Sequence, residues 1–407
     1  MAHLTFRLRR FAWLVLSRLP RWLEPLTGHR VLSVQGSPTE SASSYSVVFG
    51  ESLGILGRNV AISEVRNSQP QSVVFPPARV WRFDRAEVVH NSRFNAVVIG
   101  DKLVLPERRE PGPWAIYKGR RPRRVGLVHG QSVELVLLRR SKPVRRLPEA
   151  LFIGTRAPYN WYHWIANVLP ALHVANEGNI PRHIPLILPD EIRSFPQMME
   201  SLSVFLDARE IVWLGQDRAV QVDSLFWADS PVYDAPFSRD QSKRQPLTVH
   251  AKAMDGYKNK ILDYSAPLRK SPSRSKKIFL ARSPAAARPY NSAEVEGWAQ
   301  ELGFTLCLAD QLTFPEQVDL FRRATHIVGP TGAAWSGIMF AQPRLRALRL
   351  TGGAAPYENY FANLATISGA AIYDLPGETA NLVDGESRFK VNKESFFEAI
   401  HVLLGHP

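Results

Sequence analysis

Residues 325–343 constrain the fold of this chain more than any other segment. A short apolar run, Ile327 and Val328, is followed by a turn with two glycines and then by an alanine-rich stretch. This order predicts a buried strand, a tight turn and the start of a helix. A helix start exposes backbone N–H groups and the positive end of the helix dipole, which favour an anion such as the phosphates of a nucleotide. The residues of the predicted anion site are Gly329, Pro330, Thr331, Gly332 and Ala333.

A second candidate anion-binding segment begins about forty residues upstream. The apolar run 278–281 predicts a buried strand, and Arg282 follows at its carboxyl end, where open α/β sheets bind ligands. Arg282 and Arg288 could together clamp a diphosphate, because the guanidinium group matches phosphate oxygens. Asn291 and Glu294 have the spacing of a capping box for the next helix. We expect the two segments at adjacent strand ends of one sheet, although both arginines could also be plain surface charges.

The order of predicted elements indicates two α/β units. Residues 25–262 are predicted to form an N-terminal domain that is strand-rich to about residue 148 and alternates strands and helices afterwards. Residues 263–277 are polar, basic and proline-bearing, which is typical of a linker. Residues 278–375 predict a nucleotide-binding domain of Rossmann type, and 376–407 a tail ending in a helix. Two such units form a cleft in which ligands commonly bind.

In the 278–375 domain the predicted helices and strands alternate regularly. Helices are expected at about 160–177, 194–206 and 246–262 in the first unit, and at 291–302, 314–323, 333–341, 357–368 and 394–404 in the second.

The chain is strongly basic. Lys and Arg outnumber Asp and Glu by 51 to 37, which gives a net charge of +14. Such a surplus favours a polyanion or an anionic membrane surface. Residues 102–146 include 13 basic and 3 acidic residues. This region is therefore a candidate binding site for an acidic partner, or simply a solvated face of the protein.

Residues 1–24 predict a basic amphipathic helix, which can lie in a membrane interface or pack on the chain's own core. The apolar run 11–16 is far shorter than the ~20 residues that a transmembrane helix needs. The single cysteine, Cys307, lies in an apolar run and predicts a core residue, and a reducing compartment is the simplest inference. The sequence contains no Cys/His cluster with zinc spacing.

The N-terminal unit has its own candidate site in residues 158–170. Asn160, His163 and Asn167 recur at intervals of three and four, which places them on one face of a helix. A histidine near its ordinary pKa is a natural general base for a hydroxyl group. Because His163 lies between two tryptophans, the alternative is a histidine satisfied within the core.

Taken together, these segments resemble glycosyltransferase family 61, which includes bacterial capsule and surface-polysaccharide enzymes. The resemblance covers roughly residues 70–375. It rests on Asn160-Trp-Tyr-His-Trp164 with Leu169-Pro170, on Arg282, Arg288, Asn291 and Glu294, and on 325–333 with Phe340. Gln317 also fits the family pattern.

The resemblance implies an α/β fold of the GT-B type, with two Rossmann-like domains facing a cleft. It implies a nucleotide-sugar donor held mainly by the C-terminal domain, inversion at the anomeric carbon, and no required metal or other cofactor. Asn160 and His163 would be the catalytic residues. The donor would bind to Arg282, Arg288, Asn291, Glu294 and residues 329–333. One departure is Thr331, where the family usually has histidine, since threonine can donate a hydrogen bond but cannot be cationic.

The expected function is therefore transfer of a sugar to a hydroxyl of a bacterial cell-surface glycan, by a cytoplasmic protein peripheral to the inner membrane. The acceptor would be a glycan or glycolipid, which the basic surface suits if it is anionic. Thr331 motivates an alternative, a non-catalytic glycan- or nucleotide-binding member of an assembly complex. Charge alone would also suit a nucleic-acid-binding protein, but the sequence has no recognisable helix-turn-helix, zinc-finger or aromatic RNA-binding motif, so we expect no nucleic-acid partner.

Overall fold

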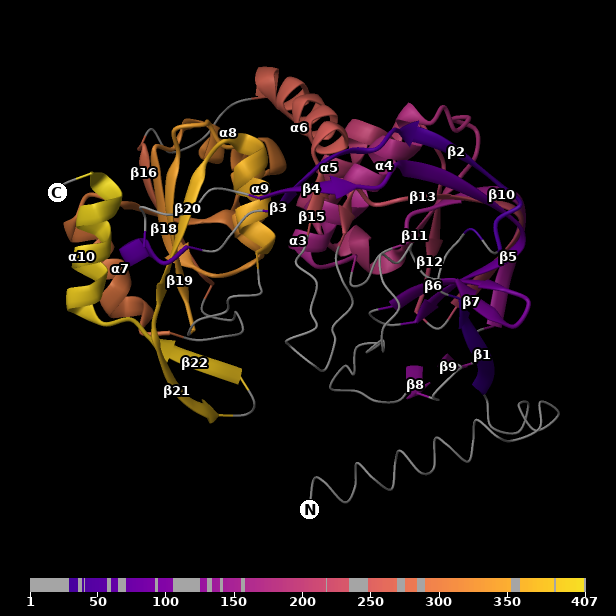
Figure 1. The fold of residues 1–407 in the computed structure, drawn as a ribbon, viewed down its shortest axis with the longest axis horizontal. Helices are drawn as coiled ribbons and strands as arrows, with labels where there is room; N and C mark the ends of the chain where they lie inside the picture. Colours follow the sequence, from indigo (N-terminus) through magenta and orange to yellow (C-terminus); the bar gives the residue numbers. More distant parts are fainter. Residues whose placement is uncertain are drawn as a thin grey trace, which may run out of the picture.

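The computed structural model shows two groups of strands and helices lying side by side (Figure 1). One group is built from the first two thirds of the chain and the other from the last third. The residues described are 29–35, 39, 41–56, 60–64, 71–91, 94–104, 125–129, 134–139, 142–154, 158–216, 218–233, 248–268, 275–283, 290–352, 359–383 and 386–405. The predicted N-terminal helix at 1–24 and Arg288 lie outside them.

The larger group is organised by an 11-stranded mixed sheet. Its main path runs β12-β11-β10-β13-β5-β6-β7-β1-β9-β8, and β2 also pairs with β5. β10 to β13 are mutually parallel where they pair, whereas β5 runs antiparallel to β13. The strand-rich part and the α/β part of the prediction therefore share one sheet. The strands are β1 (His29–Gln35), β2 (Ser44–Phe49), β5 (Ala78–Asn91), β6 (Phe94–Ile99), β7 (Lys102–Val104), β8 (Val125–His129), β9 (Glu134–Arg139), β10 (Lys142–Phe152), β11 (Leu186–Pro189), β12 (Ile211–Leu214) and β13 (Arg218–Ala228).

The helices of this group cover one part of the sheet and contain an unusual turn. The predicted helix at 160–177 is continuous, but its middle is a π-helix, so the chain has one wider turn between two α-helical segments. A short four-stranded sheet, β14-β15-β3-β4, lies beside these helices. The elements are α3 (Trp161–His163), the π-helix η4 (Trp164–Val168), α4 (Leu169–Glu177), the 3₁₀ helix η5 (Asp190–Ser194), α5 (Pro196–Leu206), α6 (Ala251–Ser265), η7 (Ala266–Leu268), β3 (Ser52–Leu56), β4 (Gln71–Phe75), β14 (Val232–Tyr233) and β15 (Thr248–His250).

The smaller group is a parallel five-stranded sheet in the order β17-β16-β18-β19-β20, shown in orange in Figure 1. From β16 the chain adds β17 on one side of the sheet, and β18, β19 and β20 then follow on the other side. The point between β16 and β18, where the direction of strand addition changes, is where doubly wound sheets bind ligands. The expected adjacency of strands 278–281 and 326–328 is confirmed. The elements are β16 (Lys277–Ala281), α7 (Ser292–Glu301), β17 (Thr305–Leu308), η8 (Ala309–Gln311), α8 (Phe314–Arg323), β18 (His326–Pro330), η9 (Ala333–Phe340), β19 (Arg346–Thr351), α9 (Tyr360–Ser368), β20 (Ala371–Pro376), β21 (Glu378–Val383), β22 (Glu386–Lys390) and α10 (Lys393–Leu404).

Three predicted elements differ from the structure. The segment predicted as an α-helix at 333–341 is instead a 3₁₀ helix. Its side chains from Trp335 onward are all buried, so the sequence has no alternation of polar and apolar residues that would distinguish three residues per turn from 3.6. The predicted helix at 246–262 starts later, at Ala251, because Thr248–His250 pairs as β15 in the small sheet. The first residues of the predicted linker, 263–265, end α6.

The buried side chains join the two groups. The largest hydrophobic cluster contains residues of both, among them Trp164 and Trp335. The Phe314 N–H donates to a Glu200 carboxylate oxygen at 2.7 Å, and Gln197 Nε2 donates to the Asp310 carbonyl at 2.9 Å. The groups therefore share one core, and their arrangement as two domains facing a cleft stays a prediction.

The C-terminal helix α10 and the 3₁₀ turn at residues 62–64 also pack into the core of the smaller group. Phe396, Ile400 and Leu403 of α10 pack with Val328 and Leu348 of its sheet. The 3₁₀ turn η3 (Ile62–Glu64) adds Ile62 to the same cluster. Residues of the predicted tail are thus part of this core.

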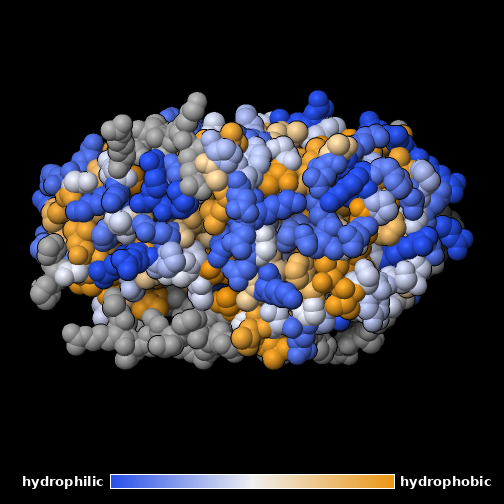
Figure 2. All heavy atoms as spheres, turned by 90° about the horizontal axis from the view of Figure 1, so that it is seen from above, coloured by the Kyte–Doolittle hydropathy of each residue, from blue (hydrophilic) through white to orange (hydrophobic). Residues whose placement is uncertain are grey.

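The outer surface mixes polar and apolar side chains. On the face in Figure 2, hydrophobic patches are separated by hydrophilic side chains. Among the described residues, no helix is long and apolar enough to cross a membrane.

Gly329 is needed for the close approach of β16 and β18. A Cβ atom at Gly329 would lie 2.6 Å from the Leu280 carbonyl oxygen, well inside contact distance. We predict that Gly329→Ala lowers the free energy of unfolding by about 1 to 3 kcal/mol, measured by urea denaturation. The matched control is Gly297→Ala in α7, where a Cβ meets nothing within 4 Å and the helix should gain about 0.5 to 1 kcal/mol. Equal stability of the two variants would contradict this reasoning.

His173 makes stability depend on pH. It is buried on α4, both ring nitrogens lack hydrogen-bond partners, and Nδ1 is 3.8 Å from Glu177 Oε1. Burial, aided by Lys260 and opposed by Glu177, lowers the pKa of His173 to about 4. The unfolded state, with a pKa near 6.5, then binds more protons between about pH 4 and 6.5, so stability present above this window falls as the pH drops through it.

We predict that His173→Leu reduces the loss of unfolding free energy between pH 7 and pH 4.5 by about 2 to 3 kcal/mol. The measurement is the difference in unfolding free energy between pH 7 and pH 4.5 for each protein. His250, whose pKa burial also lowers, is present in both proteins and cancels in the comparison. A pH dependence that is unchanged by the substitution would remove His173 as its source.

Candidate functional site

Arg282 and the glycine turn lie together at the switch point of the parallel sheet. Arg282 follows β16, and its Nη2 donates a hydrogen bond to the Thr331 carbonyl in the turn after β18. A Cβ atom on Gly332 would lie 3.3 Å from the same guanidinium nitrogen. The absence of a side chain at Gly332 thus lets the cation lie against the turn. The structure brings these predicted residues together and directs a positive charge at the loop.

The backbone N–H groups of the turn differ in whether they already have an acceptor in the sheet. The Thr331 N–H donates to the Leu350 carbonyl of β19 at 2.8 Å, so it continues the sheet. Gly332 is extended and precedes the 3₁₀ helix η9, whose first N–H groups have no acceptor within the helix. The N–H groups suited to an anion are therefore those of Gly332 and Ala333 rather than that of Thr331.

Trp335, just after the turn, is a core residue. Its side chain is fully buried, and its indole N–H donates to the Pro330 carbonyl at 2.9 Å. The indole thus holds the turn in place from the core side, through its hydrogen bond to Pro330. This buried position does not fit stacking of the indole on a ligand base.

Asn291 and Glu294 are tied to a different partner. Asn291 is at the N-cap of α7, but its side chain does not cap the helix. Its Oδ1 accepts the Val391 N–H at 2.9 Å, and its Nδ2 donates to the Val391 carbonyl at 3.1 Å and to Glu294 Oε2 at 2.8 Å. The predicted capping box is wrong, because the side chain of Asn291 joins the C-terminal segment instead. Asn291 is thus bonded to Val391, and Glu294 to Asn291, rather than to the glycine turn.

The histidine on the first helix is held by a chain of hydrogen bonds. His163 Nδ1 lies 3.0 Å from Asn167 Oδ1, and Asn167 Nδ2 donates to Ser230 Oγ at 3.3 Å. Ser230 Oγ in turn accepts the Val232 N–H at 3.3 Å. His163 and Asn167 are both buried. The two residues are four apart in this helix, and side chains at that spacing are neighbours on one helix face, so the imidazole and the amide can meet.

The network selects one tautomer of His163. Because Asn167 donates its amide to Ser230, its oxygen faces the imidazole. Nδ1 must then carry the proton, and Nε2 has the lone pair that a general base uses. Sequence spacing predicted the shared face of His163 and Asn167, but it gave no signal for Ser230, which comes from a loop after β13.

Asn160 starts the helix. Its Oδ1 accepts the Tyr162 N–H at 3.0 Å, and the residue is exposed at the N-cap. Asn160 therefore has a local structural role at an exposed position of the helix start.

The helix start and the glycine turn are brought close by packing between the two groups. α3 contacts η9, the helix that follows the turn. The Trp161 and Phe314 rings are 6.2 Å apart, and Phe314 is 6.3 Å from Phe340. A small cavity of about 10 Å³ remains there, lined by Trp161, Ile165, Phe314, Gln317, Val318, Gly337 and Phe340. Its small size and apolar lining indicate a packing gap rather than a substrate pocket.

Possible metal ligands lie elsewhere. Among the residues that the structure describes, His90, Asp190 and Glu191 form a group of metal-ligand type on β5 and η5. Sequence spacing could not reveal this group, because His90 lies a hundred residues before Asp190 and Glu191.

The comparisons with known proteins identify one family. A family model described as Glycosyltransferase 61 matches residues 161–348. The matched region begins at α3 and ends in β19, so it contains His163, Arg282 and the glycine turn. No curated protein matches the sequence.

The hydrogen-bond network makes a prediction for the free protein. We expect ¹⁵N NMR of His163 above pH 7 to show the Nδ1–H tautomer as the dominant neutral form. Asn167→Leu should remove this preference, because the leucine offers no acceptor. Ser230→Ala should weaken it less, since Asn167 Oδ1 remains in place. An Nε2–H form in the unmodified protein would contradict the assigned network.

Proposed function

Because this chain belongs to glycosyltransferase family 61, we propose that it is an inverting glycosyltransferase that transfers a sugar to a hydroxyl of a cell-surface glycan. Membership of the family implies, in general, a nucleotide-sugar donor and a glycan acceptor. The observation that carries the proposal is the meeting of Arg282 with the glycine turn at the switch point of a parallel sheet.

In this proposal the donor diphosphate binds at the switch point. The guanidinium of Arg282 and the N–H groups of Gly332 and Ala333 stabilise the negative charge that develops on the departing nucleotide. The hydrogen bond to the Thr331 carbonyl supports this role, because it holds the cation in place before the donor arrives. Arg288 would extend the clamp. No metal ion is needed for this charge stabilisation.

His163 acts as the general base on the acceptor. Its Nε2 takes the proton of the attacking hydroxyl, and the bond to Asn167 stabilises the imidazolium that results. Attack from the side opposite the nucleotide inverts the anomeric carbon. The proposed two-domain arrangement of GT-B type would put His163 and the donor on facing walls.

The positive charge supports an anionic glycan or glycolipid as acceptor. With a net charge of +14, the protein would also be attracted to an anionic membrane surface. We therefore propose a cytoplasmic protein that works at the periphery of the inner membrane on capsule, lipopolysaccharide or a related polysaccharide.

A second function is favoured by one observation, the threonine at position 331. A neutral side chain in the turn weakens the anion site relative to a cationic one. A non-catalytic member of a polysaccharide assembly complex would bind the nucleotide sugar or glycan without turnover.

We predict that His163→Ala and Arg282→Ala each lower turnover by about a hundredfold or more. A thermal-shift screen against nucleotide sugars first identifies the donor, since binding to the folded state raises the melting temperature. Release of the nucleotide then measures turnover. His163→Ala should keep the thermal shift, whereas Arg282→Ala should reduce it, because only the arginine contacts the donor.

The controls are exposed residues of the same types, His183→Ala and Arg344→Ala, which should behave like the unmodified protein. Normal turnover in His163→Ala would exclude His163 as the base. A donor-dependent shift without turnover, over a panel of acceptors, would favour the binding function.

A further inference from the structure

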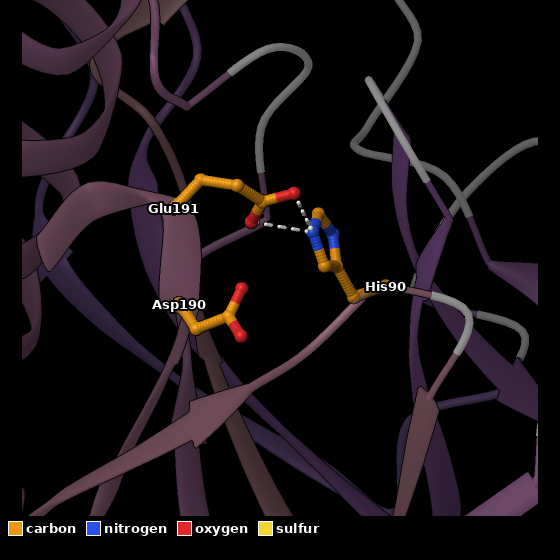
Figure 3. Close-up of side chains that lie close together, drawn as sticks. All are labelled: His90, Asp190 and Glu191. Carbon is orange, nitrogen blue, oxygen red and sulfur yellow. Dashed lines mark hydrogen bonds and ion pairs between the residues drawn. The ribbon is translucent and has the colours of Figure 1, made fainter. Parts of the chain in front are cut away.

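A group of three side chains with metal-ligand chemistry lies in the larger group of elements, apart from the glycine turn. His90 is near the end of β5, and Asp190 and Glu191 begin η5 directly after β11 (Figure 3). One ligand atom from each lies within 4.8 Å of the other two. The imidazole and both carboxylates point into the space between the two elements.

The topology of the sheet explains why these residues meet. Pro189, the last residue of β11, pairs with Leu214, the last residue of β12. A short connection leads from Leu214 to Arg218, which begins β13 and pairs with His90 on β5. The end of β11 and the end of β5 are thus both next to this connection. Gly215 in the connection leaves room for Asp190, whose Oδ2 would be 3.3 Å from a Cβ atom there.

The group places a buried imidazole against two carboxylates. His90 is 0% exposed, and its Nε2 lies 2.9 Å and 2.8 Å from the two oxygens of Glu191. Among the ion pairs of the described residues, Glu191 pairs with His90 and Asp190 takes part in none, although the Arg218 side chain also lies beside Gly215. Two adjacent carboxylates repel one another, and a single imidazole can neutralise at most one of them.

We propose that His90, Asp190 and Glu191 bind a divalent transition metal of the zinc type. One imidazole nitrogen with two carboxylate oxygens is a donor set that zinc accepts, and a water molecule would complete four ligands. Tetrahedral zinc places its ligand atoms about 3.4 Å apart. Glu191 would therefore retreat from His90 by about 0.5 Å. Calcium and magnesium fit less well, because they prefer oxygen ligands alone.

The exposed side of the group gives the ion a way in. Asp190 is exposed, and the Glu191 side chain is 35% exposed, so solvent reaches the carboxylates while His90 closes the inner side. The ion would fasten the end of β5 to the start of η5. This role is structural and does not depend on the proposed transfer reaction.

The test is zinc binding by the full-length protein after treatment with a chelator. Equilibrium dialysis against ZnCl₂ should find about one Zn²⁺ per chain, and the melting temperature should rise with the zinc concentration. Asp190→Asn and Glu191→Gln keep the side-chain shape and should each weaken binding by about tenfold or more. The matched control is Glu149→Gln, which removes an exposed carboxylate 3.8 Å from His183 and should leave zinc binding unchanged.

Visible absorption of Co²⁺ added in place of Zn²⁺ provides a second measurement on the unmodified protein. Tetrahedral d–d bands are expected, and Glu191→Gln should lose them. The absence of stoichiometric zinc binding and of these bands would overturn the proposal and leave a hydrogen-bonded ion pair. Binding that the two variants retain, or that Glu149→Gln lowers equally, would overturn it as well.

Discussion

The contact of β16 with β18 is the constraint on which the candidate site depends. Parallel strands that pair directly must end at the same edge of the sheet, so the residue after one strand meets the turn after the other. Gly329 allows this pairing where a side chain would strike the Leu280 carbonyl. The position of Arg282 against Thr331 is therefore set by backbone packing and not by the arginine itself.

Much of this half of the fold could be predicted from the sequence, because its signals are local. The helix 314–323 has the predicted bounds, since Thr313 and Glu316 form a capping box and its apolar residues keep helical spacing. The β16–β18 adjacency followed from the order of strands and helices. The position of Arg282 at a strand end followed from the same reasoning.

Features made by distant residues could not be predicted. The side chain of Asn291 bonds to Val391, a hundred residues away, and so abandons the capping box that its local spacing suggested. His90, Asp190 and Glu191 meet only because of how β11, β12, β13 and β5 connect. The 3₁₀ form of residues 333–340 could not be predicted, because a helix that is buried on all sides has no polar face whose spacing would indicate the number of residues per turn.

The helix that begins at Trp161 places the candidate base and its partner on one face. Side chains four residues apart are neighbours on a helix surface, so Asn167 Oδ1 lies within hydrogen-bond distance of His163 Nδ1. The π-helical segment Trp164–Val168 contains Asn167. The family match begins at Trp161, the first residue of the same helix.

The shared core between the two groups limits their relative motion. Tyr162 of α3 packs edge-on against Tyr360 and Phe361 of α9, and Phe314 is hydrogen-bonded to Glu200 across the same boundary. A hinge at this boundary would have to separate these rings and expose them to water, at a cost that rises with the apolar area uncovered. The molecule should therefore unfold cooperatively as one body, and its ligands should meet walls that are already in place.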